Sequence, residues 1–363
     1  MKKKKIPVKK IIALMLFSLH PLVFVYLLRM ITDHPIYVAI AMFASLLFMV
    51  VTHETGHLLF GLLTGYKFIS FRIFCFMLLR ENGMWKFKVK RVPGTSGQCL
   101  MAPPRKKGYR YPYALYNLGG ILLCGILSSI PIVISVFHMD HSILGLPLFV
   151  FGAVSFLMNL LNAIPTNGKG MLNDATNLRM ANRSAAGKEA LWNQLEYIHL
   201  LSENVRTADM PAEIFFYPQK QDLDNTLVQW QVILNVERCE DMGLYEKAKE
   251  AAEDILQNAP FLPTFFEDIL KTELIFLDTI LGSTGDHTEK ALQALEKHKV
   301  IQKTPNFARA LYAYRKLVQK DDEAASEAHD AFEKKLKKEP YPATQNFERR
   351  QMAYIAACER GIS

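Results

Sequence analysis

The stretch VVTHETGHLLFGLLTG, from Val50 to Gly65, places two histidines and a glutamate inside a run that is otherwise almost wholly apolar. It belongs to one of about four segments that are apolar over the roughly 20 residues that a bilayer-spanning helix needs. These segments are residues 11–32, 36–63, 113–137 and 142–164. The sequence therefore predicts an α-helical, polytopic membrane protein with about four transmembrane helices.

The distribution of charge predicts how these helices are oriented. Residues 1–178 carry 19 basic and 5 acidic side chains, whereas residues 179–363 carry 24 and 30. The basic groups of the first half flank or interrupt the apolar segments, a pattern that favours a lipid surface over nucleic acid as the partner. Loop 67–110 holds eleven basic residues and one acid, while the links after the first and third spans hold no Lys or Arg. The positive-inside rule predicts a multi-pass protein of the cell membrane whose N-terminus, loop 67–110 and C-terminal half are cytoplasmic.

Two domains follow from the change in composition. Residues 1–180 form the predicted transmembrane domain, and residues 181–363 form a predicted cytoplasmic domain that is all α-helical. Three segments of the second domain resemble one another, with alanines at Ala248, Ala291 and Ala325 and apolar residues spaced three and four apart. Their separation is close to that of tetratricopeptide helix pairs. An ordinary α-helical bundle explains the same pattern equally well.

The loop between the second and third spans contains a predicted β-hairpin, in the region 67–100. Its sequence is rich in aromatic and β-branched residues, and RENG, residues 80–83, is typical of a turn between two strands. Because the segment is both apolar and basic, we expect it to associate with the membrane. The alternative is a surface hairpin that serves only packing.

The spacing H-E-x-x-H indicates a metal site. Residues four apart lie on one face of a helix, so His53 and His57 can bind one zinc ion. Glu54 lies beside that face, where it can take a proton from water that the zinc activates. Ionisable residues inside a spanning helix are costly and usually functional. A polar trio that bonds neighbouring helices is the alternative.

A catalytic zinc usually has three protein ligands, so one more is expected. His53 lies about 17 residues into its span, hence about 26 Å from the outer face at a rise of 1.5 Å per residue. His138 and His141 lie at the outer ends of their spans and are therefore at the wrong depth. The carboxylate at about the right depth is Asp174, which follows the fourth span after Pro165 and a glycine-rich break. The alternative role for Asn173 or Asp174 is to cap a helix that runs toward Met180.

The segment HETGHLLFGLLTG, together with NAIP and the downstream aspartate, resembles the site-2 protease family of intramembrane zinc metalloproteases. The resemblance covers residues 36 to 180. It implies that the histidines of residues 53–57 bind zinc, that Glu54 is catalytic, that Asn162 and Pro165 form the N-x-x-P element, and that Asp174 is the third ligand. It also implies a hairpin that dips into the membrane and pairs with the substrate as an added strand. Two departures are a longer gap before Asp174 and Ala175 in place of the usual glycine.

The predicted function is that of a zinc metalloendopeptidase that hydrolyses peptide bonds in or near the transmembrane segments of other membrane proteins. Zinc is the expected cofactor, and Asn162 is expected to hold the substrate backbone or the developing oxyanion. The helical domain is expected to bind a cytoplasmic protein partner or the substrate tail. The alternative is a membrane scaffold of protease ancestry that binds partners but does not cleave them. A zinc transporter is disfavoured because the sequence offers no second set of buried ligands.

Overall fold

The computed structural model describes residues 32–92, 95–105, 110–137, 143–166 and 172–361. The predicted first span, 11–32, lies outside the described residues except for Thr32. The described part of the chain is mostly helical, with 12 α-helices and a four-stranded antiparallel sheet. It divides into two compact units, one formed by residues up to Gly56 with Gly120–Ala163 and the other by His57–Gly119 with the residues from Ile164 onward.

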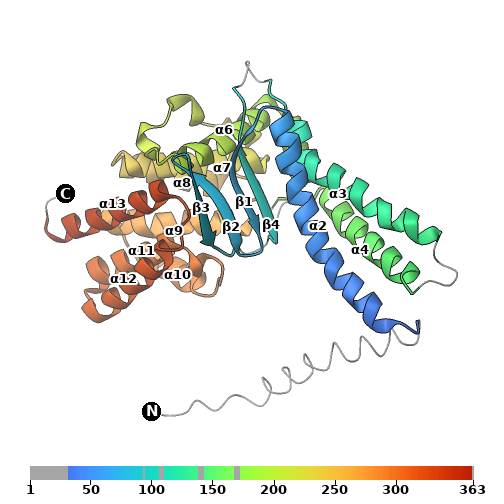
Figure 1. The fold of residues 1–363 in the computed structure, drawn as a ribbon. Coiled ribbons are helices and arrows are strands. Elements are labelled where there is room, and N and C mark those ends of the chain that lie inside the picture. The colour runs from blue at the N-terminus through green and yellow to red at the C-terminus, as the bar shows by residue number, and fades with distance from the viewer. Residues whose placement is uncertain (1–31, 93–94, 106–109, 138–142, 167–171, 362–363) are drawn as a thin grey trace, which may run out of the picture. The chain divides into compact units, whose positions relative to one another are not determined.

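Three helices of the described chain are long and apolar enough to cross a membrane, which indicates a multi-pass membrane protein. They are α2 (Pro35–Leu63), α3 (Tyr113–Val136) and α4 (Gly145–Ala163), which group together in Figure 1. Their bounds agree with three of the predicted spans to within three residues. Helix is the expected conformation because it pairs the backbone polar groups of each segment internally. The orientation of these helices stays a prediction.

Small residues allow two of these helices to approach closely. A Cβ atom built on Gly152 of α4 would lie 2.8 Å from the carbonyl oxygen of Ser128 and 3.0 Å from the amide of Ile132, both in α3. The Ser155 hydroxyl lies one turn further along α4, 3.3 Å from the carbonyl oxygen of Ser45 in α2. Close backbone approach at small residues is the usual basis of helix association in lipid.

A glycine ends α2 and directs the chain into the sheet. Gly65 has φ +87°, and the amide of Tyr66 donates to the carbonyl of Gly61 at 2.9 Å. This is the Schellman pattern of helix termination, which needs a residue in the left-handed region. The first strand begins two residues later, at Lys67.

The predicted turn at residues 80–83 is present, but the predicted hairpin is part of a larger sheet. Asn82 and Gly83 have φ of 49° and 76°, as the tight Asn-Gly hairpin turn requires. Residues 97–102 also pair with the first strand, so the sheet has the order β3-β2-β1-β4. The strands are β1 (Lys67–Ile73), β2 (Phe76–Glu81), β3 (Met84–Val89) and β4 (Gly97–Ala102).

One face of the sheet packs against the helical region that follows. Ile69, Met77 and Leu79 are almost fully buried in a cluster with Tyr197 and Leu201 of the helix α6. Alternation along each strand explains why these residues share one face. The sheet and the C-terminal helices therefore share a hydrophobic core.

The remainder of the described chain is helical, as predicted. Its α-helices are α5 (Asp174–Arg183), α6 (Ala185–Ser202), α7 (Thr226–Asp241), α8 (Tyr245–Asn258), α9 (Thr264–Ile280), α10 (Asp286–Leu295), α11 (Pro305–Ala313), α12 (Asp322–Leu336) and α13 (Pro342–Glu359). Shorter 3₁₀ or π segments are η1 (Thr207–Asp209), η2 (Ala212–Ile214), η3 (Lys220–Asp222), η4 (Ile301–Lys303) and η5 (Tyr314–Gln319).

The three similar segments of the sequence each form the second helix of a pair. The pairs are α7 with α8, α9 with α10, and α11 with α12, and the two helices of each pair are in contact. Ala248 of α8 and Ala325 of α12 are buried, and Ala291 of α10 is half-buried. The alanines lie where neighbouring helices meet, which explains their spacing. Membership of the tetratricopeptide class stays a prediction.

Candidate metal centre

The motif H-E-x-x-H lies on α2, which is unbroken from Pro35 to Leu63. The side chains of His53 and His57 are one turn apart and buried, with relative exposures of 5% and 6%. Glu54 is also buried, at 8%. Three ionisable groups are therefore held out of water inside an apolar helix, where such groups usually serve a function.

A backbone carbonyl orients His57. Its Nδ1 lies 2.7 Å from the carbonyl oxygen of Tyr116. Because a carbonyl can only accept, Nδ1 must carry the proton, and in the neutral ring Nε2 keeps its lone pair. The Tyr116 hydroxyl donates to the carbonyl of Cys99 in β4 at 2.8 Å, and its ring stacks on Tyr66. The imidazole is thus held by the contact between α3 and the sheet.

An asparagine orients His53. The side-chain amide of Asn159, in α4, donates to the carbonyl oxygen of Ile121 at 2.9 Å. That contact fixes which end of the amide is nitrogen, so the oxygen Oδ1 is the atom 3.1 Å from His53 Nδ1. The ring nitrogen must therefore donate, and Nε2 is again the nitrogen with the lone pair. Metal-binding histidines commonly donate their second ring N–H to an oxygen in this way.

The third member of the group is Asp174, the first residue of α5. The helix cap is formed by Asn173, whose Oδ1 accepts from the amide of Thr176 at 3.0 Å. The side-chain amide nitrogen of Asn173 also donates to the carbonyl of Ile164 at 2.8 Å, which connects the start of α5 to the chain segment that follows α4. The carboxylate of Asp174 instead faces His57, with Oδ2 3.4 Å from Nε2.

The three side chains fit a divalent metal ion. One ligand atom each from His53, His57 and Asp174 lies within 4.8 Å of the others. Two ligands of a tetrahedral zinc, each about 2.0–2.1 Å from the ion, lie about 3.3 Å apart, which is close to the separation of His57 Nε2 and Asp174 Oδ2. Two neutral imidazoles and one carboxylate form a donor set that catalytic zinc sites use. The group could therefore hold a metal, whose identity the geometry leaves open.

The other two predicted site residues, Glu54 and Asn162, are not part of this convergent group. Glu54 is next to His53 on α2 but is not one of the three convergent ligands. Asn162 is half-buried at the end of α4, and the asparagine that contacts a histidine is Asn159, one turn earlier. Asn159 was not among the residues predicted from the sequence. The sequence did offer one signal for it: Asn159 is a second polar residue within an apolar span, three positions before the Asn162 that matches N-x-x-P.

The chain was compared with known protein families, with curated proteins and with solved structures, and none of them matches.

Proposed function

We propose that the protein is an intramembrane zinc metalloendopeptidase that hydrolyses peptide bonds in or near the transmembrane segments of membrane proteins. The observation that carries this proposal is the convergence of His53, His57 and Asp174 within 4.8 Å. Both imidazoles turn Nδ1 toward an oxygen acceptor, the orientation that metal-binding histidines commonly adopt, and so direct Nε2 toward the side where Asp174 lies.

The residues take the following roles in the proposed reaction. His53, His57 and Asp174 hold the ion, which when bound supplies a Lewis acid that activates water at neutral pH. Glu54 takes the proton of the attacking water and then delivers it to the amine that leaves. The products are a carboxylate and an amine, so the reaction consumes one water. Asn162 holds the substrate backbone or stabilises the negative charge that develops on the carbonyl oxygen.

The sheet supplies a place for an extended substrate. In the order β3-β2-β1-β4 the edge strands are β3 and β4. Peptide hydrolysis needs an extended backbone, and a sheet edge pairs with the polar groups of such a backbone. The helical region would bind the cytoplasmic part of the substrate or a protein partner. With N-terminus and helical region in the cytoplasm, water would reach the site from that side.

The test compares the wild-type chain with Glu54→Gln in proteoliposomes that contain single-span membrane proteins. We expect wild type to release fragments, and we expect Glu54→Gln to release none while retaining about one zinc per chain. Glu203→Gln, an exposed glutamate in the helical region, is the matched control and should cleave like wild type. Identical fragments from wild type and Glu54→Gln would refute the proposal. Zinc binding without any cleavage would favour the non-cleaving scaffold.

A further inference from the structure

The C-terminal helical region contains an acidic pocket that the proposed reaction does not use. It has a volume of about 150 Å³. Its wall is formed by apolar side chains of α7, α9 and α13, and its acidic lining by four glutamates. The apolar residues include Trp230, Ile233, Val236, Ile269, Leu270 and Phe347, and the glutamates are Glu237, Glu240, Glu273 and Glu348.

One buried cation lies among these four carboxyl groups. Arg309 of α11 is fully buried, and it donates to Glu348 at 2.9 Å and to Glu273 at 2.7 Å. Its guanidinium also lies 4.0 Å from the ring centroid of Phe276. A single guanidinium can neutralise one of the four carboxylates. The pocket is therefore short of positive charge when its glutamates are ionised.

Glu240 is the carboxyl group that lacks a donor. It is 1% exposed and lines the pocket. Neither of its side-chain oxygens has a hydrogen-bond partner among the described residues. Arg309 Nη2 lies 3.6 Å from Oε2 of Glu240, beyond hydrogen-bond distance. A buried carboxyl group without a donor is costly, and a ligand that brings N–H groups would satisfy it.

Burial also changes the titration of these carboxyl groups. Burial raises the pKa of Glu237 and of Glu348 to about 7. Burial, followed by the nearby Glu273, raises the pKa of Glu240 well above its ordinary value. Arg309 in α11 acts in the opposite direction, and Tyr197 in α6 donates a hydrogen bond to Glu237. A positive ligand would allow more of these carboxyls to ionise.

The arrangement suits an organic cation better than a metal ion. Among the described residues, the His53, His57 and Asp174 group is the one in which at least three candidate ligands converge within 4.8 Å. The four glutamates do not converge in that way. Apolar walls beside an acidic lining match a side chain that has a hydrocarbon stem and a charged end.

We propose that this pocket binds a lysine side chain of a peptide, with the ammonium group at Glu240 and the stem against the apolar walls. An ammonium group carries three N–H donors, enough to satisfy both oxygens of Glu240. That the peptide belongs to a substrate rests on the proposed function, because lysines and arginines accumulate on the cytoplasmic side of membrane spans. Binding itself does not depend on cleavage.

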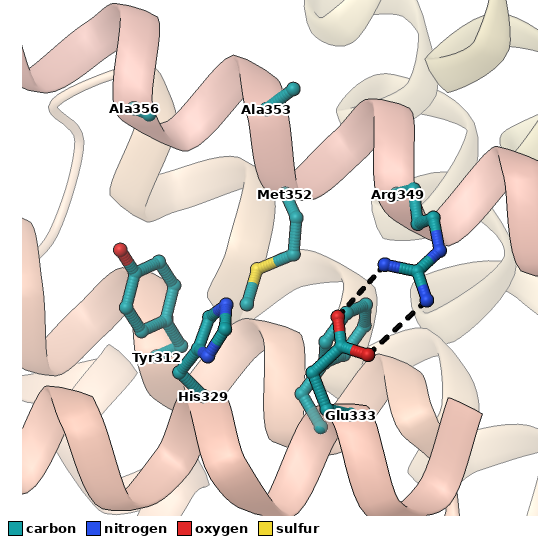
Figure 2. Close-up of a pocket in the computed structure, with 8 residues that line it drawn as sticks. Tyr312, His329, Glu333, Arg349, Met352, Ala353 and Ala356 are labelled. Atoms are coloured by element: carbon teal, nitrogen blue, oxygen red, sulfur yellow. Dashed lines mark hydrogen bonds and ion pairs between the residues drawn. The ribbon is translucent and has the colours of Figure 1, made fainter. Parts of the chain in front are cut away.

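A second pocket on the same region provides the control. It is about 290 Å³ in volume and is lined by residues of α11, α12 and α13, including His329 and Met352. Figure 2 shows that its charged groups already pair with each other, since Arg349 donates to both oxygens of Glu333, at 2.9 and 3.2 Å. It lacks the uncompensated carboxyl that distinguishes the first pocket.

The experiment measures binding of a short fluorescent peptide, with blocked ends and several lysines, to the full-length Glu54→Gln chain in detergent micelles. A peptide with glutamine at each lysine is the matched probe. We expect the lysine peptide to bind at least about tenfold more tightly than the glutamine peptide, and Glu240→Gln to remove that difference. Glu333→Gln should leave the Kd within about twofold. Thr344→Trp, which fills the pocket from α13, should weaken binding as Glu240→Gln does.

Equal affinity for the two peptides, or unchanged binding in Glu240→Gln, would overturn the proposal. Displacement of the peptide by millimolar calcium that depends on Glu240, at constant ionic strength, would assign the pocket to a metal ion and would also overturn it. Because the chain carries Glu54→Gln and binding is measured directly, a negative result would leave the proposed peptidase function untouched. In the same way, an absence of cleavage in the peptidase assay would not contradict lysine binding at this pocket.

Discussion

Replacing Asn159 with leucine should weaken metal binding without removing a ligand. Asn159 is 3% exposed, and its Oδ1 accepts the Nδ1 proton of His53 at 3.1 Å. Leucine has a similar volume and cannot accept, so the ring N–H would be left unpaired in a buried site. The imidazole could then rotate or change tautomer, and the nitrogen with the lone pair would no longer be fixed beside His57 and Asp174.

The magnitude follows from the contact that is lost. A buried donor left without an acceptor costs about 1–3 kcal/mol. Since 1.36 kcal/mol is a factor of ten at equilibrium, the metal Kd should rise between about fivefold and about 150-fold. The loss seen when the hydrogen-bond partner of a metal-binding histidine is removed, about 10- to 100-fold, falls inside that range.

The assay is competition between the detergent-purified chain and a chromophoric zinc chelator. Ser155→Ala is the matched control, because Ser155 is fully buried one turn earlier on α4 but donates to backbone carbonyls, away from the two histidines. It should leave the Kd unchanged. If Asn159→Leu binds zinc as tightly as wild type while its unfolding midpoint is unchanged, Asn159 does not orient His53 and the reasoning fails.

Three further predictions test the site, the helix packing and the acidic pocket. Asp174→Ala should weaken zinc binding by more than about a hundredfold, beyond the effect of residues that only orient ligands; zinc content after dialysis measures this, and full occupancy would exclude Asp174 as a ligand. Gly152→Ala should destabilise the fold by about 1–3 kcal/mol, because the new Cβ would lie 2.8 Å from the Ser128 carbonyl. Thermal unfolding in detergent measures it, and Gly125→Ala, whose nearest neighbour would be 3.6 Å away, should change little. Burial raises the pKa of Glu240 in the folded chain above 4.5, so folding takes up a proton and the stability that the neutral group provides is lost as pH rises above about 4.5. Urea unfolding from about pH 5 to about pH 8 should therefore show the stability of Glu240→Gln rising relative to that of wild type, by at most about 1.4 kcal/mol per pH unit, and parallel pH profiles would contradict this.

Features set by neighbouring residues could be predicted from the sequence. The spans from 36, 113 and 142 were found because apolar runs of sufficient length form helices in lipid. The turn at Asn82 and Gly83 was found because few residues adopt positive φ. The fourth strand of the sheet was missed because residues 97–102 pair with β1, whose partners lie 24 to 35 residues earlier, and nothing local marks that pairing.

The sequence by itself determined that His53 and His57 lie one turn apart on an apolar helix, because helical periodicity is a local property. From the sequence, either Asn173 or Asp174 could cap the helix α5, and only the tertiary structure decided which residue does so. Asn173 forms the helix cap, while the Asp174 carboxylate lies against His57. The choice of Asn159 over Asn162 as the partner of His53 likewise depended on how α4 packs, since both have the same chemistry. The acidic pocket at Glu240 arose from four helices that are far apart in the chain. Burial and convergence depend on contacts across the fold, so residue spacing alone does not reveal them.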